Sequence, residues 1–131
     1  EYVYFDRDGV VVECSASTTQ GVPVVTGLSF DSVVLYEPLP VANKEVFQTI
    51  LSISQLYDKY EMEAELIQFT TGGNIIVHTG NIKASMGKGD NIDDKVMTLA
   101  SIMPELSGLS GTVKLENYTK DSKNVIFKPD K

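Results

Sequence analysis

Residues 61–86 read EMEAELIQFTTGGNIIVHTGNIKASM, and this pattern of apolar runs and turn residues predicts three consecutive strands. In 61–66 glutamates alternate with apolar residues, which is the two-residue period of a half-buried strand whose carboxylates face water. Apolar runs at 75–79 and 82–86 follow, and short segments rich in glycine and asparagine separate them. Such short connections favour an antiparallel meander.

Helices are predicted on both sides of this meander. Asn43 is a good N-cap, and the apolar residues after it recur at helical spacing over about 16 residues. Their buried stripe consists of Val46, Ile50, Ile53 and Tyr57. A second helix begins after Asp90 or Asn91 and ends near Pro104. Its stripe consists of Ile92, Val96, Leu99 and Met103.

Further strands are predicted toward both ends of the chain. Residues 2–13 indicate a hairpin around an Asp-Gly turn, and 22–28 an extended segment held by proline. Strands over 112–117 and 124–128 follow the second helix. The sum is a single α+β domain over 1–131, with an antiparallel or mixed β-sheet of about seven strands and two main helices packed on one face.

Composition narrows the function classes. The 131 residues are 42% hydrophobic and 22% charged, as expected for one globular domain. Eleven basic and eighteen acidic side chains give a formal charge of -7, which argues against nucleic-acid binding. Cys14 is the only cysteine, so no internal disulfide forms; this fits either a cytosolic domain or a bacterial extracytoplasmic one. Because the chain starts at Glu1 without methionine, we expect it to be a piece of a longer protein.

Residues that carry chemistry are sparse. His78 is the only histidine and has no other histidine or cysteine near it in sequence, so we predict no metal, no cofactor and no enzyme activity. The competing hypothesis is a small extracytoplasmic enzyme or ligand-binding domain of cell-wall metabolism. It requires polar groups to converge in a pocket, around Glu61, Glu63 and His78.

Four segments, taken in order, support a family resemblance. They are YFDRDGVVV (4–12), VPVVTGL (22–28), SMGKGD (85–90) with the helix that follows, and GTVKLE (111–116) with NVIFKP (124–129). In this order they resemble the extracytoplasmic β domain of the bacterial cell-division family FtsQ, called DivIB in Gram-positive bacteria. The most specific match is 22–28, where the family has Leu-Pro-Val-Ile-Thr-Gly-Leu. The long, charged turn 118–123 favours the Gram-positive DivIB type.

The resemblance implies a non-enzymatic scaffold of the division machinery. In the family, a transmembrane helix and a POTRA domain precede the β domain, so the full-length protein is anchored in the cell membrane at the division septum. The family binds FtsL and FtsB (DivIC in Gram-positive bacteria) and regulates septal peptidoglycan synthesis. Direct contact of the scaffold with peptidoglycan is a further alternative.

The resemblance also implies where the partners bind, because the family captures a partner strand along its last β-strand. The corresponding residues here are Asn124, Val125, Ile126, Phe127, Lys128 and Pro129. An edge strand with consecutive apolar residues offers unpaired backbone groups and apolar side chains on both faces, which suits strand addition. Tyr118 is either an additional aromatic anchor or an ordinary turn residue.

Lysines flank this predicted strand. Lys123, Lys128 and Lys131 form a local basic cluster on an acidic domain. Charged residues beside an apolar edge oppose aggregation. They also favour an acidic partner segment.

Overall fold

The computed structural model describes residues 2–119, 121–122 and 124–130. The chain begins with a two-stranded antiparallel hairpin of β1 (Tyr2–Phe5) and β2 (Val11–Ser15). The Asp6 carboxylate accepts hydrogen bonds from the backbone N–H groups of Asp8 and Val10 at 2.9 and 3.0 Å. This Asx-type turn closes the hairpin. Gly9, of the predicted Asp8-Gly9 pair, has the positive φ expected of such a turn, 79°.

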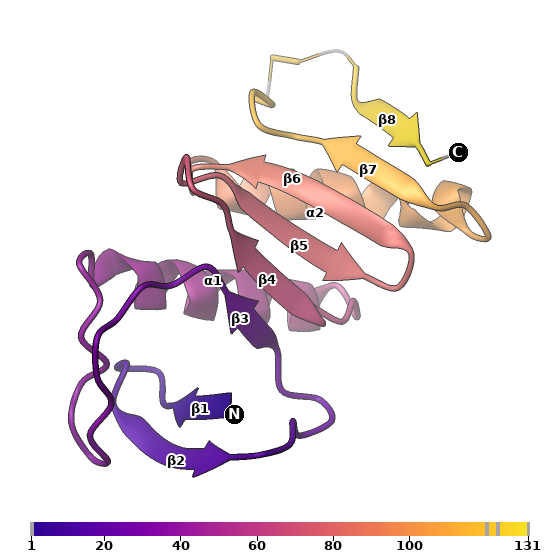
Figure 1. Cartoon of the computed structure of the whole chain (residues 1–131). Helices are drawn as coiled ribbons and strands as arrows, with labels where there is room; N and C mark the ends of the chain where they lie inside the picture. The colour runs from indigo at the N-terminus through magenta and orange to yellow at the C-terminus, as the bar shows by residue number, and fades with distance from the viewer. Residues whose placement is uncertain (1, 120, 123, 131) are drawn as a thin grey trace.

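A second, six-stranded sheet forms most of the molecule, and its strands lie side by side in chain order (Figure 1). These strands are β3 (Val24–Thr26), β4 (Leu66–Phe69), β5 (Ile75–Thr79), β6 (Ile82–Gly87), β7 (Gly111–Lys114) and β8 (Ile126–Pro129). The central strands β4, β5 and β6 are antiparallel, which confirms the predicted meander. The pairs β3–β4 and β6–β7 are parallel, and β8 returns antiparallel to β7.

A helix crosses over between the strands of each parallel pair. Helix α1 (Glu45–Lys59) joins β3 to β4, and α2 (Ile92–Ile102) joins β6 to β7 and continues into the short 3₁₀ helix η1 (Met103–Leu106). Both crossovers start from strands of the same direction and move the same way along the sheet. Since parallel crossovers are almost always right-handed, both helices must cover the same face. Figure 1 shows them together behind the sheet, and the opposite face, here called the open face, carries no helix.

The hydrophobic core lies between the helices and the sheet. Ile67, Val77, Ala84 and Val113 are paired in register across β4 to β7, and each is at most 1% exposed. The helices cover this row with Ile53 and other apolar residues of their predicted stripes. Within the described part of the chain, no helix combines the length and apolarity needed to cross a bilayer.

The α+β architecture with two helices on one face is thus confirmed, but the strand count and the sheet arrangement differ from the prediction. The described residues form eight strands rather than about seven, divided between two sheets. The strand predicted at 61–66 begins only at Leu66. Glu61 has a positive φ of 57°, and the N–H of Met62 bonds back to Tyr57 at the end of α1, so this segment continues the helix terminus.

Candidate partner-binding edge

Strand β8 forms one edge of the six-stranded sheet and, among the described residues, pairs with β7 alone (Figure 1). Its residues Ile126, Phe127, Lys128 and Pro129 lie opposite Lys114, Val113, Thr112 and Gly111. The strand begins two residues later than the predicted 124–128, because Asn124 and Val125 precede the paired region, and it ends one residue later. The edge residues predicted from the resemblance therefore lie on or directly before this strand.

The side chains of β8 alternate between the two faces of the sheet. Phe127 is half-buried, lies opposite Val113 and packs against the core, as does Val125. Ile126 lies on the open face and is 63% exposed, the second largest exposed fraction among the large hydrophobic residues described. The edge therefore has apolar side chains on both faces, as the sequence predicts.

Gly111 allows β8 to pack closely on β7. A Cβ atom at this position would lie 2.7 Å from Cζ of Phe127 and 2.8 Å from Cα of Pro129, too close for either. The missing side chain gives the Phe127 ring its place against the core. The position of the edge strand thus depends on a glycine in the strand beside it.

Backbone hydrogen bonds show which groups of β8 are free. On β7, the N–H groups of Gly111 and Leu115 donate to Asn81 and Ser85 beside β6, at 3.1 and 2.9 Å. Because bonding direction alternates along a strand, the even-numbered residues between them face β8. The N–H of Asp130 donates to Ser110 at 2.9 Å, which continues that ladder.

It follows that the even-numbered residues of β8 bond to β7, while the odd-numbered ones face away from it. The N–H and C=O of Phe127 therefore point to the free edge. Pro129 occupies the next outward position, where its lack of an N–H breaks no bond to β7; such positions are where sheets tolerate proline. The free ladder is consequently short and ends at Pro129.

The other predicted binding residues are less directly placed at the edge. Tyr118 is half-buried and packs against the core, and its N–H bonds to the carbonyl of Leu115 at 3.1 Å. Lys128 is exposed on the open face beside Ile126. Lys123 and Lys131 lie outside the described residues.

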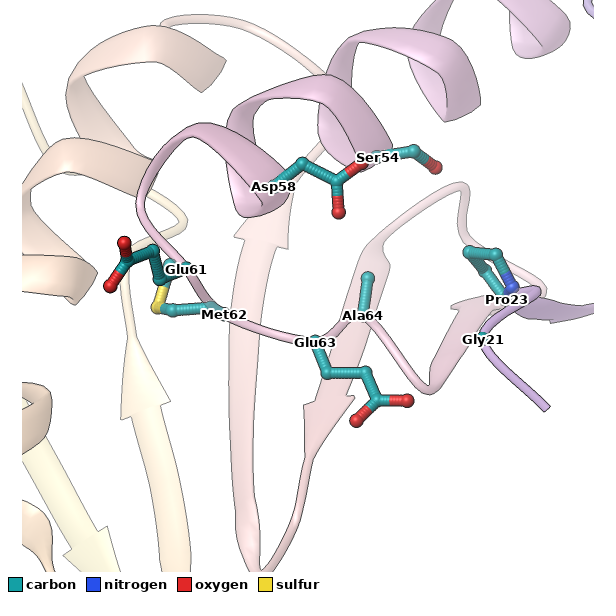
Figure 2. A pocket seen from close by; sticks show the side chains of 8 residues that line it. All are labelled: Gly21, Pro23, Ser54, Asp58, Glu61, Met62, Glu63 and Ala64. Atoms are coloured by element: carbon teal, nitrogen blue, oxygen red, sulfur yellow. The ribbon is translucent and has the colours of Figure 1, made fainter.

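The polar constellation of the competing enzyme hypothesis is not brought together. Glu61 and Glu63 line a hollow of about 370 Å³ between the end of α1 and the segment before β3. Figure 2 shows their carboxylates pointing in different directions. His78 is not among the residues that line this hollow, and its Nε2 lies 3.3 Å from Oε1 of Gln68 on the neighbouring strand. Among the described residues no group of three or more metal-ligating side chains occurs.

A larger groove that the sequence does not predict lies between the β1–β2 hairpin and the β3–α1 side of the six-stranded sheet. Its volume is about 510 Å³, and its lining is more apolar than polar. Tyr4, Phe30 and Phe47 are among the residues that line it. The Tyr4 hydroxyl lies 2.8 Å from Oγ1 of Thr19, within hydrogen-bond distance.

Comparison with known proteins finds no family model that matches this chain and no curated protein that matches it. A functional proposal must therefore be argued from the edge strand, together with the motif resemblance.

Proposed function

We propose that this chain is an extracytoplasmic β domain of the FtsQ/DivIB type. In this proposal it acts as a non-enzymatic scaffold at the division septum, where it binds FtsL and FtsB/DivIC and so regulates septal peptidoglycan synthesis. The full-length protein would be anchored in the cell membrane by an upstream helix. One observation carries the proposal: β8 is an edge strand with outward backbone groups at Phe127 and an exposed Ile126 beside them.

The physical mechanism is strand addition. A partner strand laid along β8 pairs with the outward N–H and C=O of Phe127, and each backbone hydrogen bond contributes roughly 0.5–1.5 kcal/mol. Covering Ile126 adds about 1–2 kcal/mol of hydrophobic stabilisation. Because the ladder is short, the side chains beside Ile126 and Phe127 must supply most of the specificity.

The first test separates the edge from the rest of the surface. Ile126→Asp places a charge on the open face of β8 without changing the core, and we expect it to weaken binding at least about tenfold, since it removes the apolar contact and a partner strand would have to desolvate the carboxylate. Val12→Asp on β2 is the matched control, because Val12 is also an exposed strand residue, at 45%. Calorimetric titration with the purified extracytoplasmic parts of FtsL and FtsB/DivIC measures both affinities.

The second test addresses the backbone. Val125 lies two residues before Phe127, so its N–H also points away from β7 by the same alternation. Val125→Pro removes this donor and keeps an apolar side chain, and we expect weaker binding with an unchanged fold. Phe127→Asp and removal of the residues after 123 should abolish binding, but both also disturb packing against the core. If Ile126→Asp and Val125→Pro both bind the partners as the parent does, strand addition at β8 is wrong.

A further inference from the structure

Three lysines gather on the open face of the sheet, on the three strands nearest the proposed binding edge. Lys83 on β6 and Lys128 on β8 both lie opposite Thr112 of β7, so they share one row across the sheet. Lys114 lies in the next row, between Ser85 and Ile126. All three side chains are exposed. We call Lys83, Lys114 and Lys128 the lysine patch.

None of the three lysines forms an ion pair within 4 Å with a described carboxylate. Among the described residues, the one ion pair within 4 Å joins Lys95 to Asp90, away from the open face. Two carboxylates near the patch are held by uncharged donors and keep their negative charge: Glu116 accepts from the hydroxyl of Ser85 at 2.6 Å, and Glu65 accepts from the N–H of Gly80. On a protein with a formal charge of -7, the ammonium groups of the lysine patch are therefore exposed and available to a partner at β8.

An added strand would continue the rows of this face. It would lie about 4.8 Å beyond β8, and every second side chain would project onto the open face. One such side chain would lie in the row of Lys128, and another in the row of Ile126 and Lys114. Cross-strand neighbours of opposite charge are favourable, whereas like charges are not.

We propose that the segment added at β8 is an acidic strand, with carboxylates on the face beside the lysine patch and apolar side chains on the face beside Phe127. This inference rests on the proposed strand addition and specifies the chemistry of its partner. Lys128 is the direct cross-strand neighbour of an added strand and contributes most, because Lys114 and Lys83 lie one and two strands further away and charges are screened over about 8 Å at physiological ionic strength.

A lipid surface or a free anionic polymer would also be attracted to lysines. The placement of the patch favours a peptide strand as the ligand, because the cross-strand rows that contain the lysines end at β8, where backbone groups are free. Neither a headgroup nor a polyanion needs such an edge. The two explanations therefore differ in whether binding depends on Ile126 and on the backbone at Val125.

The test uses three blocked ten-residue peptides that alternate valine with glutamate, with glutamine or with lysine. We expect the glutamate peptide to bind at least about fivefold more tightly than the glutamine peptide, and the lysine peptide to bind most weakly. Raising the salt concentration from about 0.05 to 0.5 M should remove most of the difference. The double variant Lys114→Glu/Lys128→Glu should reverse the order of the peptides. Lys44→Glu, at an exposed position just before α1, is a single-charge control that should preserve it.

Each outcome decides between the ideas. Equal binding of the glutamate and glutamine peptides, still weakened by Ile126→Asp, overturns the acidic preference and leaves strand addition standing. Binding of the glutamate peptide that Ile126→Asp and Val125→Pro do not affect overturns both. Binding to phosphatidylglycerol vesicles that needs the lysines, without any preference among the peptides, replaces the strand by an anionic surface. Failure of all three peptides to bind overturns this inference, while the titration with FtsL and FtsB/DivIC tests the proposed function separately.

Discussion

The ammonium nitrogen of Lys95 lies 2.7 Å from the carbonyl oxygen of Met86, and the Lys95 side chain is completely buried. The same ammonium group donates to the carbonyl of Glu116 at 3.2 Å and to the carboxylate of Asp90 at 3.4 Å. One side chain from the first turn of α2 therefore links the end of β6 to the segment after β7. Its three donors match three acceptors, which allows the burial of a cation.

Removal of the Lys95 ammonium group should destabilise the domain. Lys95→Met keeps the length of the side chain but leaves two buried carbonyl oxygens without this donor, so we expect the free energy of unfolding to fall by about 2–4 kcal/mol. Urea denaturation measures the change. Lys88→Met is the control at an exposed position. Equal, small losses in the two variants would show that Lys95 has no special structural role.

Gly111 should tolerate no side chain. We expect Gly111→Ala to cost about 1–3 kcal/mol, because the new methyl group would overlap the Phe127 ring and the backbone of β8. The backbone amides of Ile126 and Lys128 should then exchange faster with solvent, as measured by NMR. Gly72→Ala is the control, since nothing lies within 4 Å of a Cβ at that position. Unchanged exchange at β8 would show that the strand does not depend on this glycine.

Tyr57 carries a buried hydroxyl that the fold does not satisfy. The phenol lies close to Thr79, yet among the described residues neither hydroxyl has a hydrogen-bond partner of normal geometry. Burial raises the pKa of the Tyr57 phenol above its usual range, and the neighbouring Thr79 acts in the opposite direction. Because Tyr57→Phe removes only an unpaired polar atom, stability should stay constant or rise by up to about 1 kcal/mol. A loss of more than about 1 kcal/mol on thermal unfolding would reveal a hydrogen bond here.

His78 should make stability depend on pH. Burial, followed by the positive charge of Lys83, lowers the pKa of His78 below 6.5, and Glu65 opposes this effect. Below about pH 6.5 the unfolded chain therefore binds the proton more readily than the folded one, so stability falls as the pH decreases. Between about pH 7 and 5, His78→Gln should flatten this dependence.

The same titration reports on the open face. Lys83→Gln removes a positive charge near the imidazole, so the pKa of His78 should rise toward 6.5 in an NMR titration. Thr112→Gln is a neutral-to-neutral control in the same row. An unchanged pKa of His78 in Lys83→Gln would contradict the electrostatic coupling across β5 and β6.

Local pattern was sufficient to predict several elements. The stripe from Ile50 to Tyr57 predicted α1, and the short turns around Ile75–Thr79 predicted the central meander. The prediction failed where two tendencies compete. Residues 61–64 have the alternation of a strand, but the turn at the end of α1 holds them outside the sheet, and the backbone bonds to the neighbouring strands begin at Glu65. Glu61 and Glu63 are exposed all the same.

The candidate site was harder to predict, because whether a strand lies at the edge of a sheet depends on which strands pair, and local sequence does not determine this. The residues of β8 were predicted as a strand, but whether the backbone N–H and C=O of Phe127 face the free edge depends on the register of β8 with β7. The sequence predicted a basic cluster that includes Lys128, but it missed Lys83 and Lys114, which are far from Lys128 in sequence and join it only through two long-range strand pairings. The local signal of Lys83 and Lys114 was an exposed position within a predicted strand.

The agreement between strand order and chain order has a consequence for how the molecule forms. Each strand from β4 onward pairs with a strand that has already emerged from the ribosome, so the sheet can grow in one direction during synthesis. Helices α1 and α2 each precede the second strand of a parallel pair in the chain, so each helix is synthesised before that strand. Strand β8 is the last described strand in this order. Its outer backbone groups can therefore accept a partner strand only after β8 has paired with β7 on the completed sheet.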